Sequence, residues 1–110
     1  MLSLRLYLLQ RITALLMAPL VLGHLAVIVY ATQGGLSAAE ILGRTHGSVP
    51  WLLFYGTFVF AVSIHAAIGV RAIVHEWAGL KGVVLEVVMW ATGFGLFALG
   101  ARAVWAVTFA

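Results

Sequence analysis

The sequence predicts an all-α integral membrane protein with three transmembrane helices, and three observations support this. First, 65% of the 110 residues are hydrophobic and only 8% are charged, whereas roughly 25% of a soluble domain is charged. Second, the mean hydropathy is +1.16, so the polar residues are too few to cover a small globule in water. Third, the apolar residues form three runs that can each cross about 30 Å of hydrocarbon. None alternates as the strands of a closed barrel must.

The first predicted helix covers about residues 8–31. Its apolar run from Ile12 to Ala31 is interrupted only by Thr13, Pro19 and His24. A proline is tolerated inside a membrane span, because neighbouring helices or a local kink satisfy the carbonyl that it frees. The run is longer than the apolar part of a secretory signal, so we expect it to be retained.

A polar loop follows, from Thr32 to Pro50. Within it, the segment Ser37-Ala38-Ala39-Glu40 has the form of a capping box and predicts a short interfacial helix over about residues 38–42.

The second predicted helix covers about residues 49–74 and the third about residues 83–107. Pro50 stands at a helix start and Trp51 at a membrane interface. The short polar connection between the two helices includes Glu76, Trp77 and Lys81. We expect residues 1–110 to form a single membrane-anchor domain.

The basic residues predict the orientation. Four lie on the amino-terminal side of the membrane and two on the opposite side: Arg5, Arg11, Arg71 and Lys81 against Arg44 and Arg102. This bias places the amino terminus in the cytoplasm and the carboxyl terminus outside. The same residues are too few and too scattered for a nucleic-acid surface, so we expect no nucleic-acid partner.

Small residues on the spans predict close helix packing. They occur in three pairs: Ser63 and Ala67, Ala91 and Gly95, and Gly93 and Gly100. Such residues let other helices approach closely. Because three helices make a poor bundle by themselves, we also expect a partner subunit.

Histidine is the main candidate metal ligand, because the chain has no cysteine. His65 is 14 residues past Trp51, which places it about 21 Å from the outer boundary. An ionisable group at that depth indicates function. Two interpretations stay open: a ligand of haem iron, with Gly69 leaving room for a flat macrocycle, or a hydrogen bond to a neighbouring helix.

His24 lies at a different level from His65. It is six residues before Tyr30, hence about 9 Å from the outer boundary. The difference of about 12 Å is too large for one haem to be held by both. His24 is therefore either structural or the ligand of a second haem. We expect His46 to be solvated in the loop, and His75 to cap the second helix or to face a haem propionate.

Four side chains at the cytoplasmic edge could meet: Arg11, Arg71, Glu76 and Trp77. Such donors and a carboxylate suit hydrogen bonding to a quinone headgroup and transfer of its protons. The alternative is ordinary membrane anchoring, with Glu76 paired to Arg71 or Lys81. We expect Glu86 to be an interfacial charge.

Three segments resemble a known family in their order and spacing. They are Gln10-Arg11-Ile12-Thr13-Ala14, Ala31-Thr32-Gln33-Gly34-Gly35-Leu36, and His65-Ala66-Ala67-Ile68-Gly69-Val70-Arg71 followed by Glu76-Trp77. On these segments the chain resembles the cytochrome b membrane anchors, of C and D type, of succinate dehydrogenase and fumarate reductase in respiratory complex II.

The resemblance implies roles for individual residues. His65 looks like the axial ligand of haem b, Arg11 like an arginine near the quinone, and Glu76-Trp77 like the acidic and aromatic pair that closes the quinone site. Some relatives carry two haems, with a first-helix histidine on the outer haem and a second-helix histidine on the inner one, and the depths of His24 and His65 fit that layout. Where the family carries Asp and Tyr, this chain has Glu and Trp, and Tyr7 replaces a serine of the C type. We therefore place it nearer the D type, although Gly69-Val70-Arg71 is similar to the C type.

The resemblance also implies partners and a location. These are a second membrane-anchor subunit, an iron–sulfur subunit, an FAD flavoprotein, ubiquinone or menaquinone, and the lipid of the bacterial cytoplasmic (inner) membrane. One haem b, or two, would be shared with a partner, and this chain would perform no dicarboxylate chemistry. Two alternatives stay open: a quinone-binding anchor without haem, and a small helical assembly or transport subunit with no redox role.

Overall fold

The computed structural model describes residues 3–109, and these form four helices without a strand. They are α1 (Leu4–Gly34), α2 (Ala38–Thr45), α3 (Val49–Ala78) and α4 (Gly82–Thr108). The helices α1, α3 and α4 are each long and apolar enough to cross a membrane. The prediction of an all-α protein with three membrane-spanning helices is therefore confirmed.

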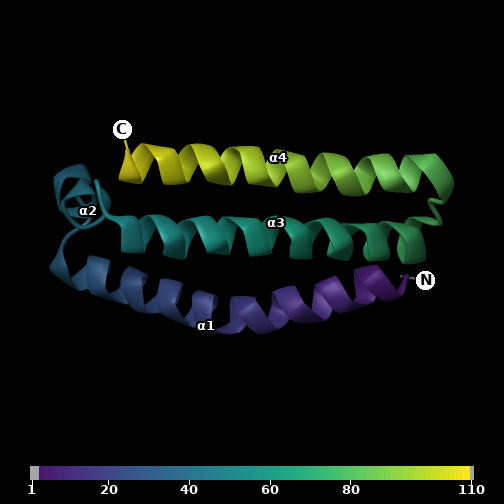
Figure 1. Cartoon of the computed structure of the whole chain (residues 1–110), viewed down its shortest axis with the longest axis horizontal. Helices are drawn as coiled ribbons and strands as arrows, with labels where there is room; N and C mark the ends of the chain where they lie inside the picture. Colours follow the sequence, from purple (N-terminus) through teal and green to yellow (C-terminus); the bar gives the residue numbers. More distant parts are fainter. Residues whose placement is uncertain (1–2, 110) are drawn as a thin grey trace.

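The three long helices lie side by side in a row, with α3 between α1 and α4 (Figure 1). The start of α1 and the α3–α4 turn lie at one end of the row, whereas α2 and the end of α4 lie at the other. The molecule is 47 Å long, close to the thickness of about 40–45 Å of a bilayer with its headgroups.

The short helix α2 continues to Thr45, three residues past its predicted end. The long helices α1 and α3 also extend beyond their predicted bounds, because their caps lie outside the apolar runs. At the start of α1, the Ser3 side chain accepts a hydrogen bond from the Leu6 backbone N–H. At the end of α3, Gly79 adopts a left-handed conformation and its N–H donates to the His75 carbonyl. A helix can continue through polar residues beyond an apolar run, and it ends where a capping residue satisfies its terminal backbone groups.

The contact between α3 and α4 is made close by small residues of the chain itself. A Cβ atom on Gly93 would lie 3.2 Å from the Ala67 Cβ, and one on Gly100 only 2.5 Å from a methyl carbon of Val59. Ser63 and Ala67 are buried. The prediction that these small residues let helices approach closely is therefore confirmed for Ser63, Ala67, Gly93 and Gly100, and the helices that meet there are α3 and α4 of this chain. Ala91 and Gly95 are exposed.

The Gly100→Ala variant is expected to be less stable than the wild type by about 1–3 kcal/mol, because the new methyl group overpacks the α3–α4 contact against the stiff Val59. Thermal unfolding of the purified membrane complex measures the effect. Gly95→Ala is the matched control on the same helix, since nothing lies within 4 Å of its Cβ position. It should be neutral or stabilising, by up to about 1 kcal/mol. Equal losses in the two variants would contradict the proposed packing.

The first helix is bowed in Figure 1, and Pro19 lies inside it. Proline has no N–H to donate to the carbonyl one turn earlier, and its ring clashes with that turn, so a bend is expected there. Beyond the proline, Gly23 allows close contact with α3, since a Cβ atom there would lie 3.1 Å from the Phe54 ring.

The short helix α2 and the residues after it are joined to the end of α4 by hydrogen bonds. The Ser37 side chain accepts a hydrogen bond from the Glu40 N–H, which confirms the predicted helix start. The buried Thr45 hydroxyl donates to the Val107 carbonyl at 2.7 Å, and the Gly47 N–H donates to the Thr108 carbonyl at 2.8 Å. These donors satisfy last-turn carbonyls that have no partner within α4.

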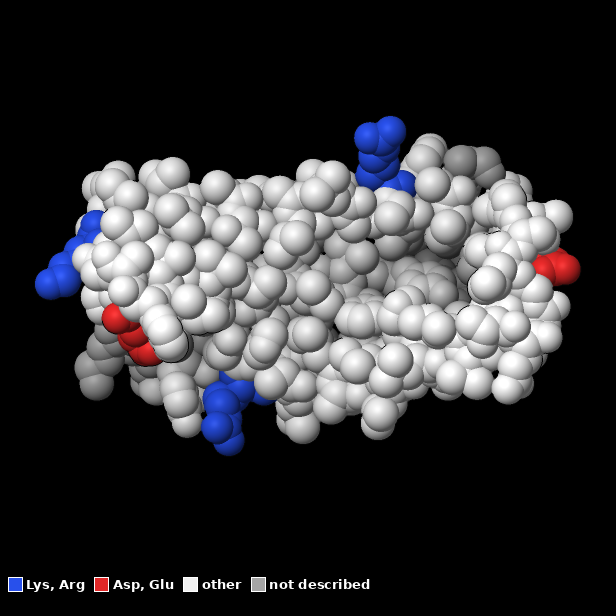
Figure 2. Space-filling view, turned by 180° about the vertical axis from the view of Figure 1, so that it is seen from behind, with Lys and Arg blue, Asp and Glu red and all other residues white. Residues whose placement is uncertain are grey.

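Charged side chains are sparse on the surface. Figure 2 shows a mostly uncharged face with only a few Lys, Arg, Asp and Glu side chains. Large apolar side chains are exposed along the long helices, including Leu15, Leu22, Phe94 and Leu99. A surface of this kind is compatible with contact with lipid or with other apolar helices.

Candidate functional site

His65 lies near the middle of α3 and faces α1. Its Nδ1 is 3.2 Å from the hydroxyl oxygen of Thr13, which is only 4% exposed. The Thr13 hydroxyl is itself 2.7 Å from the Leu9 carbonyl oxygen, one turn earlier in α1. The other ring nitrogen, Nε2, makes no hydrogen bond within residues 3–109 and is not fully buried. One nitrogen of the imidazole is therefore held by α1 and the other is available to a ligand.

The position one turn beyond His65 also faces α1. A Cβ atom on Gly69 would lie 3.6 Å from the amide nitrogen of Gln10. The side-chain oxygen of Gln10 is buried and has no partner among the described residues. Gly69 is thus in contact with Gln10 in this chain, and a planar group placed there would have to displace that long side chain.

His24 lies in the other half of the row. Its ring packs edge-on against Tyr55 and Phe58, with centroids 6.2 and 5.3 Å apart. Its Nδ1 is buried without a partner among residues 3–109. The ring borders a cavity of about 360 Å³ between α3 and α4, and Figure 2 shows the surface hollowed in the half nearer α2. The contacts with Tyr55 and Phe58 put His24 between about 10 and 15 Å from His65 along α3.

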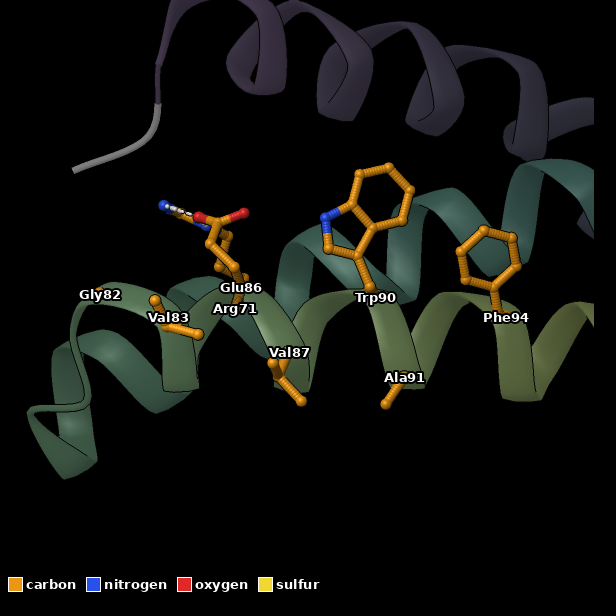
Figure 3. A pocket seen from close by; sticks show the side chains of 8 residues that line it. All are labelled: Arg71, Gly82, Val83, Glu86, Val87, Trp90, Ala91 and Phe94. Carbon is orange, nitrogen blue, oxygen red and sulfur yellow. Dashed lines mark hydrogen bonds and ion pairs between the residues drawn. The ribbon is translucent and has the colours of Figure 1, made fainter.

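Arg71 and Glu86 form the single ion pair within residues 3–109. The guanidinium Nη2 is 2.9 Å and Nε 3.3 Å from the same carboxylate oxygen of Glu86. The Arg71 side chain is 15% exposed and that of Glu86 47%. Figure 3 shows the two side chains facing each other, with the Trp90 indole on the same side of α4 and its nitrogen turned toward them. They border an open, largely apolar pocket of about 690 Å³.

The four side chains predicted to meet at the cytoplasmic edge are not joined by any hydrogen bond or ion pair in the described part of the chain. Arg71 pairs with Glu86 and not with Glu76 or Lys81. Glu76 and Trp77 are exposed, Trp77 by 86%, and the Arg11 guanidinium lies 5.9 Å from the centre of the Tyr7 ring. Five residues of helix separate Arg71 from Glu76, so the two point about 140° apart around α3.

The sequence reasoning missed Glu86 as a partner of Arg71. Their positions in the sequence could have predicted this pair. Both residues lie within a few turns of the same short connection, on helices that must run antiparallel to each other. Opposite charges within apolar spans pair with each other where they can. His75 is used locally, since its Nδ1 lies 2.8 Å from the Leu80 carbonyl oxygen and closes the α3–α4 turn. His46 is exposed, as expected.

The fold and these polar groups define a three-span membrane anchor, with one histidine at mid-span, another nearer α2 and an ion pair near the α3–α4 turn. The family model described as the succinate dehydrogenase/fumarate reductase transmembrane subunit matches residues 2–107. The chain therefore belongs to this family. Searches of curated proteins and of solved structures found no match.

Proposed function

We propose that this chain is the haem b-binding membrane anchor of a succinate:quinone or quinol:fumarate oxidoreductase in a bacterial cytoplasmic membrane. The observation that carries the proposal is the His65 imidazole at mid-span, whose Nε2 makes no hydrogen bond among residues 3–109, in a chain of the family named above. Family membership favours this function over a transport or assembly subunit without a redox role. The same anchor serves either direction, because direction depends on the potentials of the groups bound by the complex.

The donor atoms of the chain fit haem better than a bare metal ion. In the described part of the chain, no three His, Asp or Glu side chains come together as a metal site, and cysteine is absent. A porphyrin brings four ring nitrogens of its own, so one imidazole per face completes the coordination. When bound, haem b supplies a one-electron carrier. His65 would hold it through Nε2, and the second anchor subunit would supply the opposite ligand.

His24 is the candidate ligand for a second haem nearer α2. It borders the 360 Å³ cavity, and its separate level along α3 agrees with two haems rather than one shared haem. Its buried Nδ1 lacks a partner in residues 3–109. A group from the second anchor subunit would therefore be needed to accept or donate a hydrogen bond there.

The quinone headgroup would bind at the end of the row that holds the α3–α4 turn. Arg71 uses Nε and Nη2 on Glu86. Its Nη1 makes no hydrogen bond among the described residues and can donate to a quinone oxygen. Arg11, Glu76 and Trp77 lie on the surface at the same end and would complete the site together with the iron–sulfur subunit. The Glu76 carboxylate can transfer protons to the reduced ring, and the N–H groups of Arg11 and Trp77 can donate hydrogen bonds to its oxygens.

Purification of the native complex through a tag on this chain is expected to bring down a flavoprotein and an iron–sulfur protein. The preparation should reduce a short-chain quinone with succinate and show a b-type band in its reduced-minus-oxidised spectrum. A complex with flavin and iron–sulfur clusters but no b-type band would establish the anchor without haem. Recovery of the chain without these subunits would contradict the whole assignment.

A further inference from the structure

The contact between Thr13 and His65 joins the first half of α1 to the middle of α3. Thr13 is 4% exposed and the ring is half-buried, so water has little access to the threonine hydroxyl. In such surroundings, the position of each hydrogen is determined by the few polar atoms within reach. These are the Thr13 hydroxyl, the Leu9 and Gln10 carbonyls and His65 Nδ1.

The distances show where the threonine hydrogen points. The hydroxyl oxygen is 2.7 Å from the Leu9 carbonyl, 3.1 Å from the Gln10 carbonyl and 3.2 Å from His65 Nδ1. The shortest of these is the usual length of an O–H···O bond, about 2.7–2.8 Å. Threonine in a helix commonly donates to the carbonyl four residues earlier. The single hydroxyl hydrogen therefore points at Leu9, and a lone pair of the oxygen faces His65.

We infer that Thr13 is a positioning residue, which holds His65 in the neutral tautomer that carries its proton on Nδ1. In the other tautomer, the hydroxyl would either leave its lone pair facing the lone pair on Nδ1 or give up its shorter bond to the Leu9 carbonyl in order to donate to Nδ1. Because Thr13 accepts the Nδ1–H, the lone pair of the ring is on Nε2, the nitrogen without a hydrogen bond in residues 3–109. The chain thus prepares one nitrogen of His65 as a ligand.

The consequence for haem rests on the proposed function. A metal-bound histidine that donates its other N–H has a fixed ring orientation and a more basic ligating nitrogen. A more basic ligand stabilises ferric iron over ferrous iron. The Thr13 hydroxyl should therefore lower the midpoint potential of the haem on His65 and help to retain it.

The tautomer can be tested without haem, by proton–nitrogen NMR correlation of the full-length, histidine-labelled chain in detergent micelles. The His65→Gln variant assigns the signals. We expect a protonated Nδ1 and an unprotonated Nε2 for His65 in the wild type and in Thr13→Ser, and a mixture of tautomers in Thr13→Val. Thr92→Val is the matched control, because Thr92 donates to the carbonyl one turn earlier and makes no other hydrogen bond among the described residues. A proton on Nε2 in the wild type would overturn the inference, as would a Thr13→Val spectrum identical to the wild type.

The purified complex provides the second readout. In Thr13→Val the midpoint potential of the haem should rise and haem retention should fall by about 10-fold, whereas Thr13→Ser and Thr92→Val should match the wild type. A haem whose potential and retention are the same in all variants would refute the role of Thr13 at the haem. A complex without haem would refute the proposed function and leave the tautomer result to stand by itself.

Discussion

The complex carrying His65→Gln is expected to lose the b-type absorption of the haem bound at mid-span, while its flavin and iron–sulfur content is unchanged. Glutamine keeps a similar length and can still contact Thr13, but it offers iron no imidazole nitrogen. Haem extracted per flavin and the reduced-minus-oxidised spectrum measure the loss. Haem b content equal to that of the wild type would contradict the assignment of His65 as ligand.

Two further histidine variants make this experiment selective. His46→Gln is the control, because His46 is exposed in the loop between α2 and α3 and should keep full haem content. His24→Gln distinguishes the two roles open to that residue. A second haem bound near α2 would be lost with His24, and haem per flavin would fall by half. An unchanged ratio would assign His24 to its edge-on packing against Tyr55 and Phe58.

The Glu86→Gln variant is expected to be less stable than the wild type by about 1–3 kcal/mol. The reason is that Arg71, whose side chain is only 15% exposed, would lose its charged partner. This loss lies between two reference values. An exposed ion pair contributes about 0–1 kcal/mol to stability, and breaking a buried ion pair costs roughly 3–5 kcal/mol. Thermal unfolding of Glu86→Gln, Arg71→Met and the double variant forms a double-mutant cycle. Strictly additive losses would show that the two residues do not interact.

The same variants separate stability from quinone binding. Arg71→Met is expected to raise the KM for quinone several-fold, because it removes the guanidinium that we propose donates to the headgroup. Electron transfer from succinate to an artificial acceptor that reacts with the flavoprotein should be unaffected. Lys81→Met is the control, since it removes an exposed cation beside the same turn. An unchanged KM in Arg71→Met would place the quinone away from Arg71.

The sequence predicted well those features that depend on neighbouring residues. Each apolar run became a spanning helix, and the capping box at Ser37 started α2. The different levels of His24 and His65 followed from the rise per residue. The helix faces were not predictable in the same way, because a run that is apolar all round does not show which side meets a neighbour. The Gly100 contact with Val59 and the Arg71–Glu86 pair both depend on that choice.

Among the described residues, few large apolar side chains of the three long helices are buried, and many are exposed. A porphyrin-sized ring against α3 would have one side covered by this chain and the other side covered by a second polypeptide. The ring would then raise the affinity of the two polypeptides for each other. By mass action, filling such a site strengthens the association of the two chains, and separating them releases the ring. We therefore expect the haem content and the amount of assembled complex to vary together. A cell could then limit the number of complete complexes through its supply of haem.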